Sequence, residues 1–548
     1  MNLLTLHIKN PSRKLIKFIE KLQKDKLTYK KIFKIEKQLT MKKYTLFILF
    51  ALLSSSLIFA QQWDWSNHLS SPGDVYPSES VVIDIKVDQN NNVYQSGFYN
   101  NSPLTINGTT LTNAGNWDAF ICKYDENGTL LWANTIGGSG RDDIVAIEIV
   151  GDYLFVTGAF KSSDLFFTAT ESISGSIIGT TNYDIYLAKY DLDGNFDKAT
   201  LIFWGNNSDR PRDMLYDATS KELVLIGNFK EDINYDDGTI TQLVNASSVG
   251  GKDLFAAKLD TTGIVNNFVS WEITNSSTAL KDLNFAPDTS YYVTGDLASA
   301  LYFSPVDSIK EDDGKSDALL FKLDKNLTKQ WAIKGGGSGF DHANSSIADT
   351  KGNIYLASKV ESTVVFDQDT SGALSTPIDG FGFEDMFLAK YSPFGTLQWI
   401  KRKGSIGSDD AFGLAFHENL IQFCGNFSDT VIFNGDTLKS PKVGDINTGF
   451  AIFDLDGNEI GAQSIVGDSS DIGRSIAFAN DGSTIISGYS NSNPITIGAS
   501  VYTNSDQLRD GFIAKFDYPF KANFTDSIQI NCPDGLIMLG LENMTGTY

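Results

Sequence analysis

The clearest candidate for chemistry in this sequence is the segment DLDGNFD, which begins at Asp191. It carries oxygen-bearing side chains at alternate positions, and such oxygens are the ligands that calcium prefers. These residues are Asp191, Asp193, Asn195 and Asp197. A calcium loop has its glycine at the sixth position, whereas Gly194 stands fourth, and Asp-Gly and Gly-Asn pairs are also typical of hairpin turns. We therefore keep the four residues as a weak calcium site, and calcium is the only cofactor that we consider.

A second set of acids recurs at matching places in glycine-containing segments such as TIGGSGRDD. The set consists of Asp74, Asp142, Asp209, Asp341, Asp409 and Asp471. A ring of carboxylates could attract calcium or a cationic ligand. An acid that recurs in nearly every unit is better explained as a turn-capping residue, because a ligand site usually breaks the symmetry of a repeat.

No constellation typical of catalysis is visible. The four histidines include no pair at metal-ligand spacing: they are His7, His68, His342 and His417. The three cysteines are too few for a disulfide framework and are expected to be small buried residues: they are Cys122, Cys424 and Cys532. The Gly-rich segments lack the helix that a phosphate loop requires. The sequence therefore predicts a protein that is not an enzyme.

Charge and length narrow the class of protein. The 548 residues include 44 Lys and Arg against 67 Asp and Glu, and the segment Met1 to Lys43 holds 13 of the basic residues and only 3 of the acids. The remainder is strongly acidic, which argues against nucleic-acid partners and against docking on anionic lipid. A chain of this length exceeds one hydrophobic core, so it must have several domains or a repeat architecture.

From Met41 the sequence has the pattern of a secretory signal peptide, MKKYTLFILFALLSSSLIFAQQ, with cleavage expected after Ala60. No second hydrophobic segment follows, so we expect no membrane span after cleavage and a location outside the cell or on its outer surface. Residues 1–40 precede this signal. We interpret them as a wrongly assigned N-terminal extension, and the alternative is a real amphipathic basic helix.

One phrase recurs seven times at intervals of 62 to 69 residues. It reads DAFICKYDENG, DIYLAKYDLDG, DLFAAKLDTTG, DALLFKLDKNL, DMFLAKYSPFG, NTGFAIFDLDG and DGFIAKFDYPF. A strand that usually ends in glycine, such as DYLFVTG, also occurs seven times, and a tryptophan strand follows most copies of the first phrase. Seven units are therefore indicated.

Each unit has four short strands separated by Asn, Asp and Gly turns, with an insert of about twenty residues before the third strand. Four-stranded antiparallel meanders repeated in this way are typical of propeller blades. The sequence after Ala60 starts with a tryptophan strand, and the last unit lacks one. We therefore predict an all-β, seven-bladed propeller over residues 61–517 whose N-terminal strand completes the last blade and removes a free edge.

The run DAFICKYDENGTLLWANTIGGSGRDD followed by DYLFVTGAF resembles the bacterial β-propeller repeat family called SBBP. The resemblance covers residues 61–517, and it implies a protein that a Gram-negative bacterium exports and displays. Residues 518–548 resemble the first strands of a PKD-like β-sandwich, and this segment would be truncated or disordered.

These observations favour a secreted, monomeric, non-catalytic scaffold whose variable inserts bind extracellular protein or polysaccharide, for example in adhesion. The alternative is a carbohydrate-active hydrolase or lyase with its site at the central channel. The enzyme would require acids from non-equivalent blade positions to meet at one end of that channel.

Overall fold

The computed structural model describes residues 62–517 except 71–78, 101–102, 176–181, 246–251, 275–276, 312–314, 368, 443 and 505–507. It also describes the backbone of one hairpin, β42 (Ile528–Cys532) paired with β43 (Gly535–Leu539). Residues Gln62–Asp517 form one compact unit. The predicted N-terminal extension and signal peptide lie outside the described residues, and only this hairpin represents the predicted PKD-like segment. The described residues include no helix that is long and apolar enough to span a membrane.

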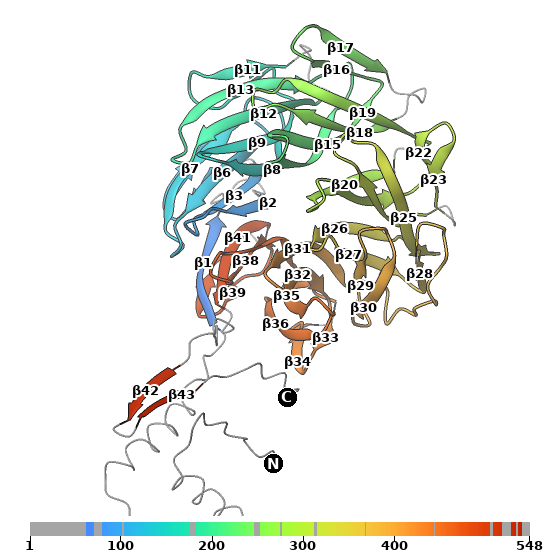
Figure 1. The fold of residues 1–548 in the computed structure, drawn as a ribbon. Coiled ribbons are helices and arrows are strands. Elements are labelled where there is room, and N and C mark those ends of the chain that lie inside the picture. Colours follow the sequence, from blue (N-terminus) through green and yellow to red (C-terminus); the bar gives the residue numbers. More distant parts are fainter. Residues whose placement is uncertain are drawn as a thin grey trace, which may run out of the picture. The chain divides into compact units, whose positions relative to one another are not determined.

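The compact unit consists of seven antiparallel sheets set around a common centre (Figure 1). We number the blades in chain order. Their innermost strands are β2 (Ser80–Val87), β8 (Asp142–Val150), β14 (Arg210–Asp217), β20 (Ala279–Phe285), β26 (His342–Ala348), β31 (Asp410–His417) and β37 (Asp471–Phe478). The second strands are β3 (Val93–Asn100), β9 (Tyr153–Phe160), β15 (Glu222–Lys230), β21 (Tyr291–Leu297), β27 (Ile354–Glu361), β32 (Leu420–Phe427) and β38 (Thr484–Ser490).

The third strands contain the recurring phrase. They are β6 (Trp117–Tyr124), β12 (Asp184–Asp191), β18 (Lys252–Leu259), β24 (Asp317–Leu323), β29 (Glu384–Tyr391), β35 (Asn447–Asp454) and β41 (Asp510–Asp517). The outermost strands are β7 (Leu130–Ile136), β13 (Phe196–Phe203), β19 (Val265–Ile273), β25 (Lys329–Gly337), β30 (Leu397–Lys403), β36 (Glu459–Ile465) and, in blade 7, β1 (Gln62–Ser70).

The ring is closed by strands from opposite ends of the unit. The N-terminal strand β1 pairs antiparallel with β41, with Leu69 opposite Gly511 and Asn67 opposite Ile513. Each innermost strand contacts the next one, and β37 contacts β2. The predicted fold class, a seven-bladed propeller completed by its N-terminal strand, is thereby confirmed.

The inserts are ordered mainly as short strands at the periphery. These are β4 (Leu104–Ile106), β5 (Thr109–Leu111), β10 (Asp164–Phe166), β11 (Ser172–Ser174), β16 (Asp232–Asp236), β17 (Thr241–Asn245), β22 (Leu301–Ser304), β23 (Asp307–Ile309), β28 (Val364–Phe366), β33 (Thr430–Phe433), β34 (Asp436–Lys439), β39 (Ile495–Ile497) and β40 (Ser500–Tyr502). Several pair with the outermost strand of the preceding blade: β4 with β1, β22 with β19, and β28 with β25. The inserts therefore cover edges that would otherwise be open to another chain.

The recurring Lys, Gly and Trp residues hold adjacent blades together. Lys123 Nζ and Trp132 Nε1 in blade 1 both donate to the carbonyl oxygen of Leu192 in blade 2, at 2.9 and 3.2 Å. Gly194 in the same turn has a φ of 84°, and a Cβ atom there would lie 2.6 Å from the Trp132 ring. The Lys, Gly and Trp of the repeated phrase therefore form a contact between adjacent blades, which we call the clamp. Trp65 in β1 makes the same contact between blades 7 and 1 by donating to Glu126 O at 3.0 Å.

Apolar side chains fill the spaces between blades. One cluster joins Leu254 of blade 3 to Leu283 and Phe321 of blade 4, and all three are buried. Cys122 and Cys424 are buried free thiols, as expected from the sequence.

Candidate functional site

All seven innermost strands carry a β-bulge at the same position near their N-terminal end. The bulged residues are Ile83, Val145, Arg212, Lys281, Asn344, Phe412 and Arg474. Every one of them is partly or fully exposed, while its neighbour on the N-terminal side is buried. A bulge re-aims a side chain, and here it presents one residue of each blade to the central channel. We call this ring, with the side chains that contact it, the channel mouth.

The glycine that recurs in most second strands does not end them, as the sequence suggested, but lies two or three residues before their C-terminal ends and belongs to this bulge. A Cβ atom on Gly97 would lie 2.1 Å from the carbonyl oxygen of Val81, and Gly158 and Gly488 stand equally close to inner-strand carbonyls in their own blades. Only a residue without a side chain allows the two backbones to approach in this way. The recurring glycine in the sequence therefore indicates the bulge, although it does not indicate which side chain the bulge directs into the channel.

The mouth breaks the repeat symmetry most strongly at blades 4 and 5. Asp296 Oδ1 lies 2.7 Å from Lys281 Nζ and 2.9 Å from His342 Nδ1. Lys281 Nζ also donates to Asn344 Oδ1 at 2.7 Å. These four residues occupy three different positions of the blade repeat, so a shared turn motif does not account for them.

The network continues into blade 6. Asn344 Nδ2 donates to Asp410 Oδ1 at 2.8 Å. Burial raises the pKa of Asp410 to about 6, and the nearby charges of Lys359 and Lys281 oppose that rise. Lys359 is itself paired with Glu384 at 2.6 Å. A histidine paired with one carboxylate, beside a second carboxylate of raised pKa, could exchange protons with a bound ligand or bind its hydroxyl groups.

Blade 3 contributes positive charge to the mouth. Arg212 is exposed, and its Nε donates only to the neutral amide oxygen of Asn228, at 3.2 Å. Lys252 is half-buried, and burial followed by the charge of Arg212 lowers its pKa to about 8. Among the described residues, neither cation has a carboxylate within ion-pair distance.

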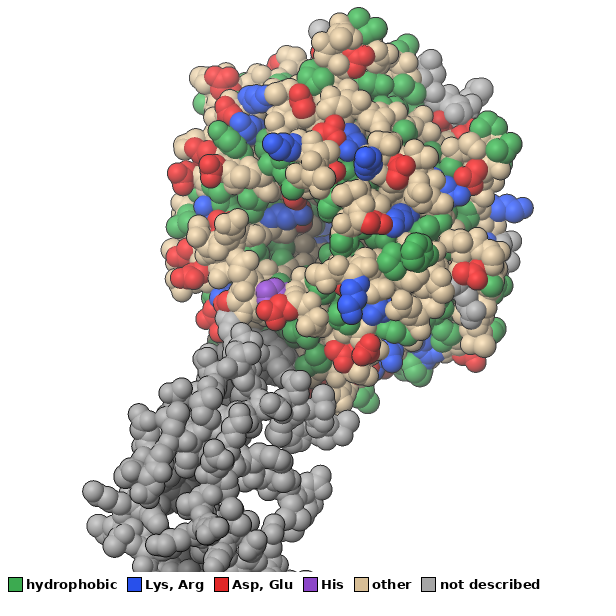
Figure 2. Space-filling view, in the orientation of Figure 1, with side chains coloured by type: hydrophobic (Ala, Val, Ile, Leu, Met, Phe, Trp, Pro, Cys, Tyr) green, Lys and Arg blue, Asp and Glu red, His purple; other side chains and the backbone are tan. Residues whose placement is uncertain are grey.

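Towards blade 2 the basic character continues. Arg210 pairs with Asp143 at 2.9 Å and lies 3.6 Å from the ring centroid of Tyr183, which Lys161 also approaches. Arg141 pairs with the same Asp143. The space-filling view shows a hollow at the centre of the ring with Lys and Arg side chains at its edge (Figure 2).

The opposite arc of the mouth is mainly apolar, although the exposed Arg474 also lies in it. Val81, Ile472 and Tyr489 form a small cluster with the half-buried Phe412 at the junction of blades 6, 7 and 1. Arg474 lies 5.1 Å from the Phe412 ring centroid. The mouth therefore has a basic arc, a mixed polar arc and an apolar arc.

Deeper in the channel, carboxylates join neighbouring blades. Asp84, Asp213 and Asp282 each accept a backbone N–H from the next blade, from Ile147, Leu283 and Ser346 respectively. Lys86 and Glu148 form an ion pair at 3.1 Å across blades 1 and 2. These contacts serve the packing of the ring.

The candidate calcium residues occupy a hairpin turn between β12 and β13. The side-chain amide of Asn195 donates to Asp191 Oδ2 at 2.8 Å, and Asp191 Oδ1 accepts the backbone N–H groups of Asp193 and Asn195 at 3.0 and 2.8 Å. The side-chain bond first, and then the backbone bonds, lower the pKa of Asp191. Asp197 pairs with Lys189 at 2.7 Å, outside the turn. Among the described residues, no three His, Cys, Asp or Glu side chains are grouped to hold a metal ion. Calcium binding stays a prediction.

The recurring turn aspartates that the structure describes are fully buried at the blade seams, where Asp142, Asp341, Asp409 and Asp471 accept hydrogen bonds but neither carboxylate oxygen of Asp209 does. Asp142 accepts bonds from Lys161 and Ser162, and Asp341 accepts the N–H groups of Gly337 and Glu361. Burial raises the pKa of Asp142 to about 6 and that of Asp209 to about 9. Asp409 and Asp471 have equivalent positions, and Asp74 lies outside the described residues.

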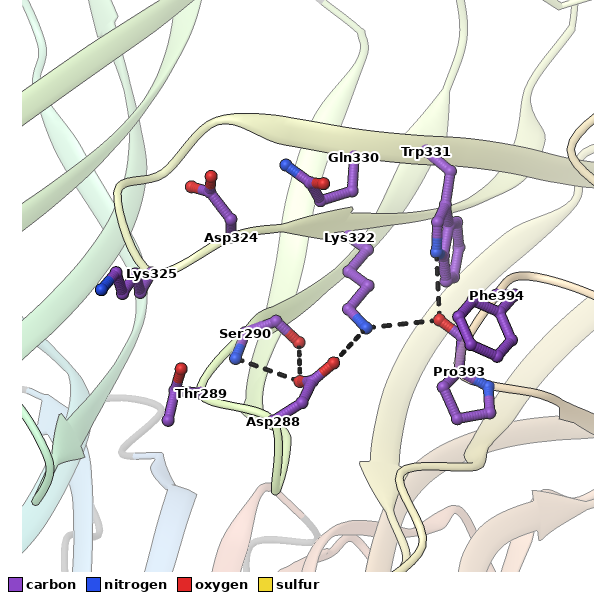
Figure 3. Close-up of a pocket in the computed structure, with 10 residues that line it drawn as sticks. All are labelled: Asp288, Thr289, Ser290, Lys322, Asp324, Lys325, Gln330, Trp331, Pro393 and Phe394. Carbon is purple, nitrogen blue, oxygen red and sulfur yellow. Dashed lines mark hydrogen bonds and ion pairs between the residues drawn. The ribbon is translucent and has the colours of Figure 1, made fainter.

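A pocket of about 380 Å³ lies at the seam of blades 4 and 5 (Figure 3). Its polar groups bind one another: Lys322 Nζ donates to Asp288 Oδ2 and Pro393 O, and Trp331 Nε1 donates to the same carbonyl. These are the Lys and Trp of the repeated clamp. The pocket is therefore a feature of blade packing, and the channel mouth is the better candidate site.

The sequence did not identify the mouth residues. His342 and Asp410 follow directly after the buried aspartates Asp341 and Asp409, so they stood beside a noted motif. Asp296 directly follows the glycine of a second strand. An alignment of the seven units at that glycine would have shown these positions to be the ones that differ between blades.

Comparisons with known proteins add the fold alone. No family model matches the chain. A segment of 115 residues is 30% identical to an uncharacterized WD repeat-containing protein of Acanthamoeba polyphaga mimivirus, covering 19% of this chain and 8% of that protein. Among similar solved structures, the Cps50 (Swd1) propeller domain of Myceliophteria thermophila has 8% identity and a TM-score of 0.37, and the match covers 82% of this chain and 99% of that one. A PL25 ulvan lyase has 8% identity and a TM-score of 0.41, and the match covers 82% of this chain and 96% of that one. A periplasmic gluconolactonase of Pseudomonas aeruginosa has 11% identity and a TM-score of 0.38, and the match covers 74% of this chain and 98% of that one. These likenesses leave the activity of this seven-bladed β-propeller undetermined.

Proposed function

We propose that this chain is an exported, monomeric binding propeller of the SBBP type, and that it binds an extracellular polymer at the channel mouth. The observation that supports the site is the network that joins Asp296 to His342 and Asp410. Asp296 lies on a second strand, whereas His342 and Asp410 are the equivalent first residues of β26 and β31 and differ in chemistry. Buried aspartates at the seams repeat from blade to blade, whereas a ligand site is expected to break that symmetry.

This proposal moves the binding surface away from the inserts. The insert strands β4, β22 and β28 pair with outer strands of neighbouring blades, so their backbone groups are occupied in bracing the ring. The mouth instead presents side chains with donor, acceptor and apolar character. Such a convergent set on a rigid scaffold is typical of ligand sites.

A binding screen of the full chain against arrays of surface polysaccharides and extracellular proteins tests the proposal. Asn344→Trp places a large ring in the mouth, and Lys281→Met removes a charge there while keeping the aliphatic stem. We expect both variants to lose the ligand that the wild type captures. The control is Val306→Ser, because Val306 is 96% exposed in the turn between β22 and β23.

Thermal unfolding of each variant checks that the ring still forms. Capture that survives both mouth variants but is lost with Val306→Ser would place the binding surface on the inserts and overturn the proposal.

A carbohydrate-active enzyme is the second candidate, favoured by the 2.9 Å contact of His342 with Asp296 beside Asp410. Two carboxyl groups and a histidine at one site can act as general acid and base. Release of reducing ends or unsaturated products from a captured polysaccharide, abolished by His342→Ala, would establish this activity. Capture without any product would exclude it.

A further inference from the structure

We infer that the channel mouth binds an acidic polysaccharide, with the uronate or sulfate groups at Arg212 and Lys252 and the sugar hydroxyls at the carboxylates of blades 4 to 6. This inference rests on the proposed function, because it names the ligand class of the same site. It follows from how charge is divided around the mouth.

The basic part of the mouth has spare positive charge. Arg212 is exposed and binds only the amide oxygen of Asn228, whose strand partner Leu254 lies two residues after Lys252. Neither cation forms an ion pair among the described residues, and the carboxylate whose charge acts on both, Asp296, is already paired with Lys281 and His342. Other cations of the mouth are paired with carboxylates, as are Lys281 with Asp296 and Lys359 with Glu384. An anionic group can therefore enter between Arg212 and Lys252 without displacing an existing ion pair, and charge-assisted hydrogen bonds would hold it there.

The polar part of the mouth has the opposite requirement. Asp296, Asp410 and Glu384 offer carboxylate oxygens at the same opening, so the ligand must bring hydrogen-bond donors to them. A sugar acid has anionic groups and hydroxyl donors on the same chain. An acidic peptide would bring further carboxylates towards these acids and would be repelled.

The overall charge of the chain confines such a ligand to the mouth. The sequence has 67 acids against 44 basic residues, so a polyanion is repelled by most of the surface. A positive potential at the mouth, on a surface that is otherwise negative, then makes the chain bind polyanions at this opening only. We expect binding to weaken with salt, since an exposed site is screened over the Debye length.

The test measures affinity of the full chain by isothermal titration for four probes: alginate oligosaccharides, sulfated dextran, neutral dextran and polyglutamate. We expect alginate or sulfated dextran to bind and the other two not to. Arg212→Gln and Lys252→Gln should each weaken that binding about tenfold or more, as expected for one charge-assisted bond. Arg212→Lys should restore part of the loss.

The matched control is Lys221→Gln. Lys221 is exposed in the turn between β14 and β15, at the other end of the hairpin that carries Arg212, so the change of net charge is identical. We expect no change in affinity. An equal loss in this variant would mean that overall charge, and not the mouth, governs binding, and this would overturn the inference.

The remaining outcomes separate the inference from the proposed function. Tight binding of polyglutamate would assign the site to acidic peptides and reject the polysaccharide. Binding of neutral dextran that is lost in Asn344→Trp but unchanged in Arg212→Gln would reject the inference and keep the mouth as the site. Binding of any probe that is unchanged in Asn344→Trp would reject both.

Discussion

Replacement of Asp118 by Asn should remove a loss of stability that the propeller undergoes as the pH rises from acidic values to about 7. Asp118 is completely buried at the seam of blades 1 and 2, where burial raises its pKa to about 7, the N–H of Ala114 opposes the rise, and the charge of Asp142 adds to it. The unfolded carboxyl titrates near 3.8. Between these two values the folded chain retains a proton that the unfolded chain has lost, so stability falls as the pH rises through this window.

The size of the effect follows from the shift. Each unit of pKa difference corresponds to about 1.4 kcal/mol, so titration of Asp118 removes roughly 3 kcal/mol of unfolding free energy between pH 5 and pH 8. The amide of Asp118→Asn does not titrate. Any loss of hydrogen bonding in the variant is constant with pH, and only the pH-dependent part of the difference reports on the carboxyl.

Urea unfolding of the full chain, followed by tryptophan fluorescence at several pH values, measures this difference. We expect the unfolding free energy of the variant, relative to that of the wild type, to increase by about 3 kcal/mol from pH 5 to pH 8. Asp471→Asn provides a comparison, because burial raises the pKa of Asp471 to about 7 although the position equivalent to Asp118 in its seam is already an amide, Asn447. A stability difference that stays flat with pH in both variants would refute the reasoning.

Three further predictions concern packing and the turns. Gly194→Ala should lower the free energy of unfolding by about 2 to 4 kcal/mol, measured by thermal unfolding, because the added Cβ atom collides with Trp132 and the positive φ is unfavourable for alanine. Gly108→Ala, at a φ of 86° with open space around it, should cost only about 1 kcal/mol. In a Cys532→Ser background, iodoacetamide at pH 8 should leave the chain unlabelled until it unfolds, since burial raises the pKa of the Cys122 and Cys424 thiols to about 12; rapid native labelling would contradict this burial. Calcium should leave the melting temperature unchanged relative to chelator, because Asp191 and Asp197 already have partners within the fold; a rise that Asp193→Asn abolishes would support the calcium site.

The sequence predicted the number of blades, their strand order and the closing strand because those features depend on residues that recur. Lys123, Trp132 and Gly194 take part in one contact that is repeated between successive blades. Because each copy of the contact requires the same residue types, the same phrase recurs in the sequence. The pairing of the inserts with preceding blades was not predictable in this way, since it depends on backbone contacts between units that share no motif.

The mouth could not be predicted for a related reason. Arg212, Lys281 and Asn344 are equivalent in structure but differ in chemistry, so no shared pattern marks them. Their neighbours come from another strand of the same blade, as Asp296 does beside Lys281, or from the next blade, as Asp410 does beside Asn344. Only the bulge, which aims the side chains towards a common axis, shows that they belong together.

The union of β1 with β41 has a consequence for how the chain is made. During synthesis β1 leaves the ribosome first, and its partner follows only after almost the whole ring has been translated. Until then this tryptophan-bearing strand can pair only through Leu69 and Ser70, with β4, and the nascent molecule is vulnerable to pairing with another copy. A factor that shields this first segment would raise the yield of correctly assembled molecules, and detaching it from a finished ring would reopen blade 7.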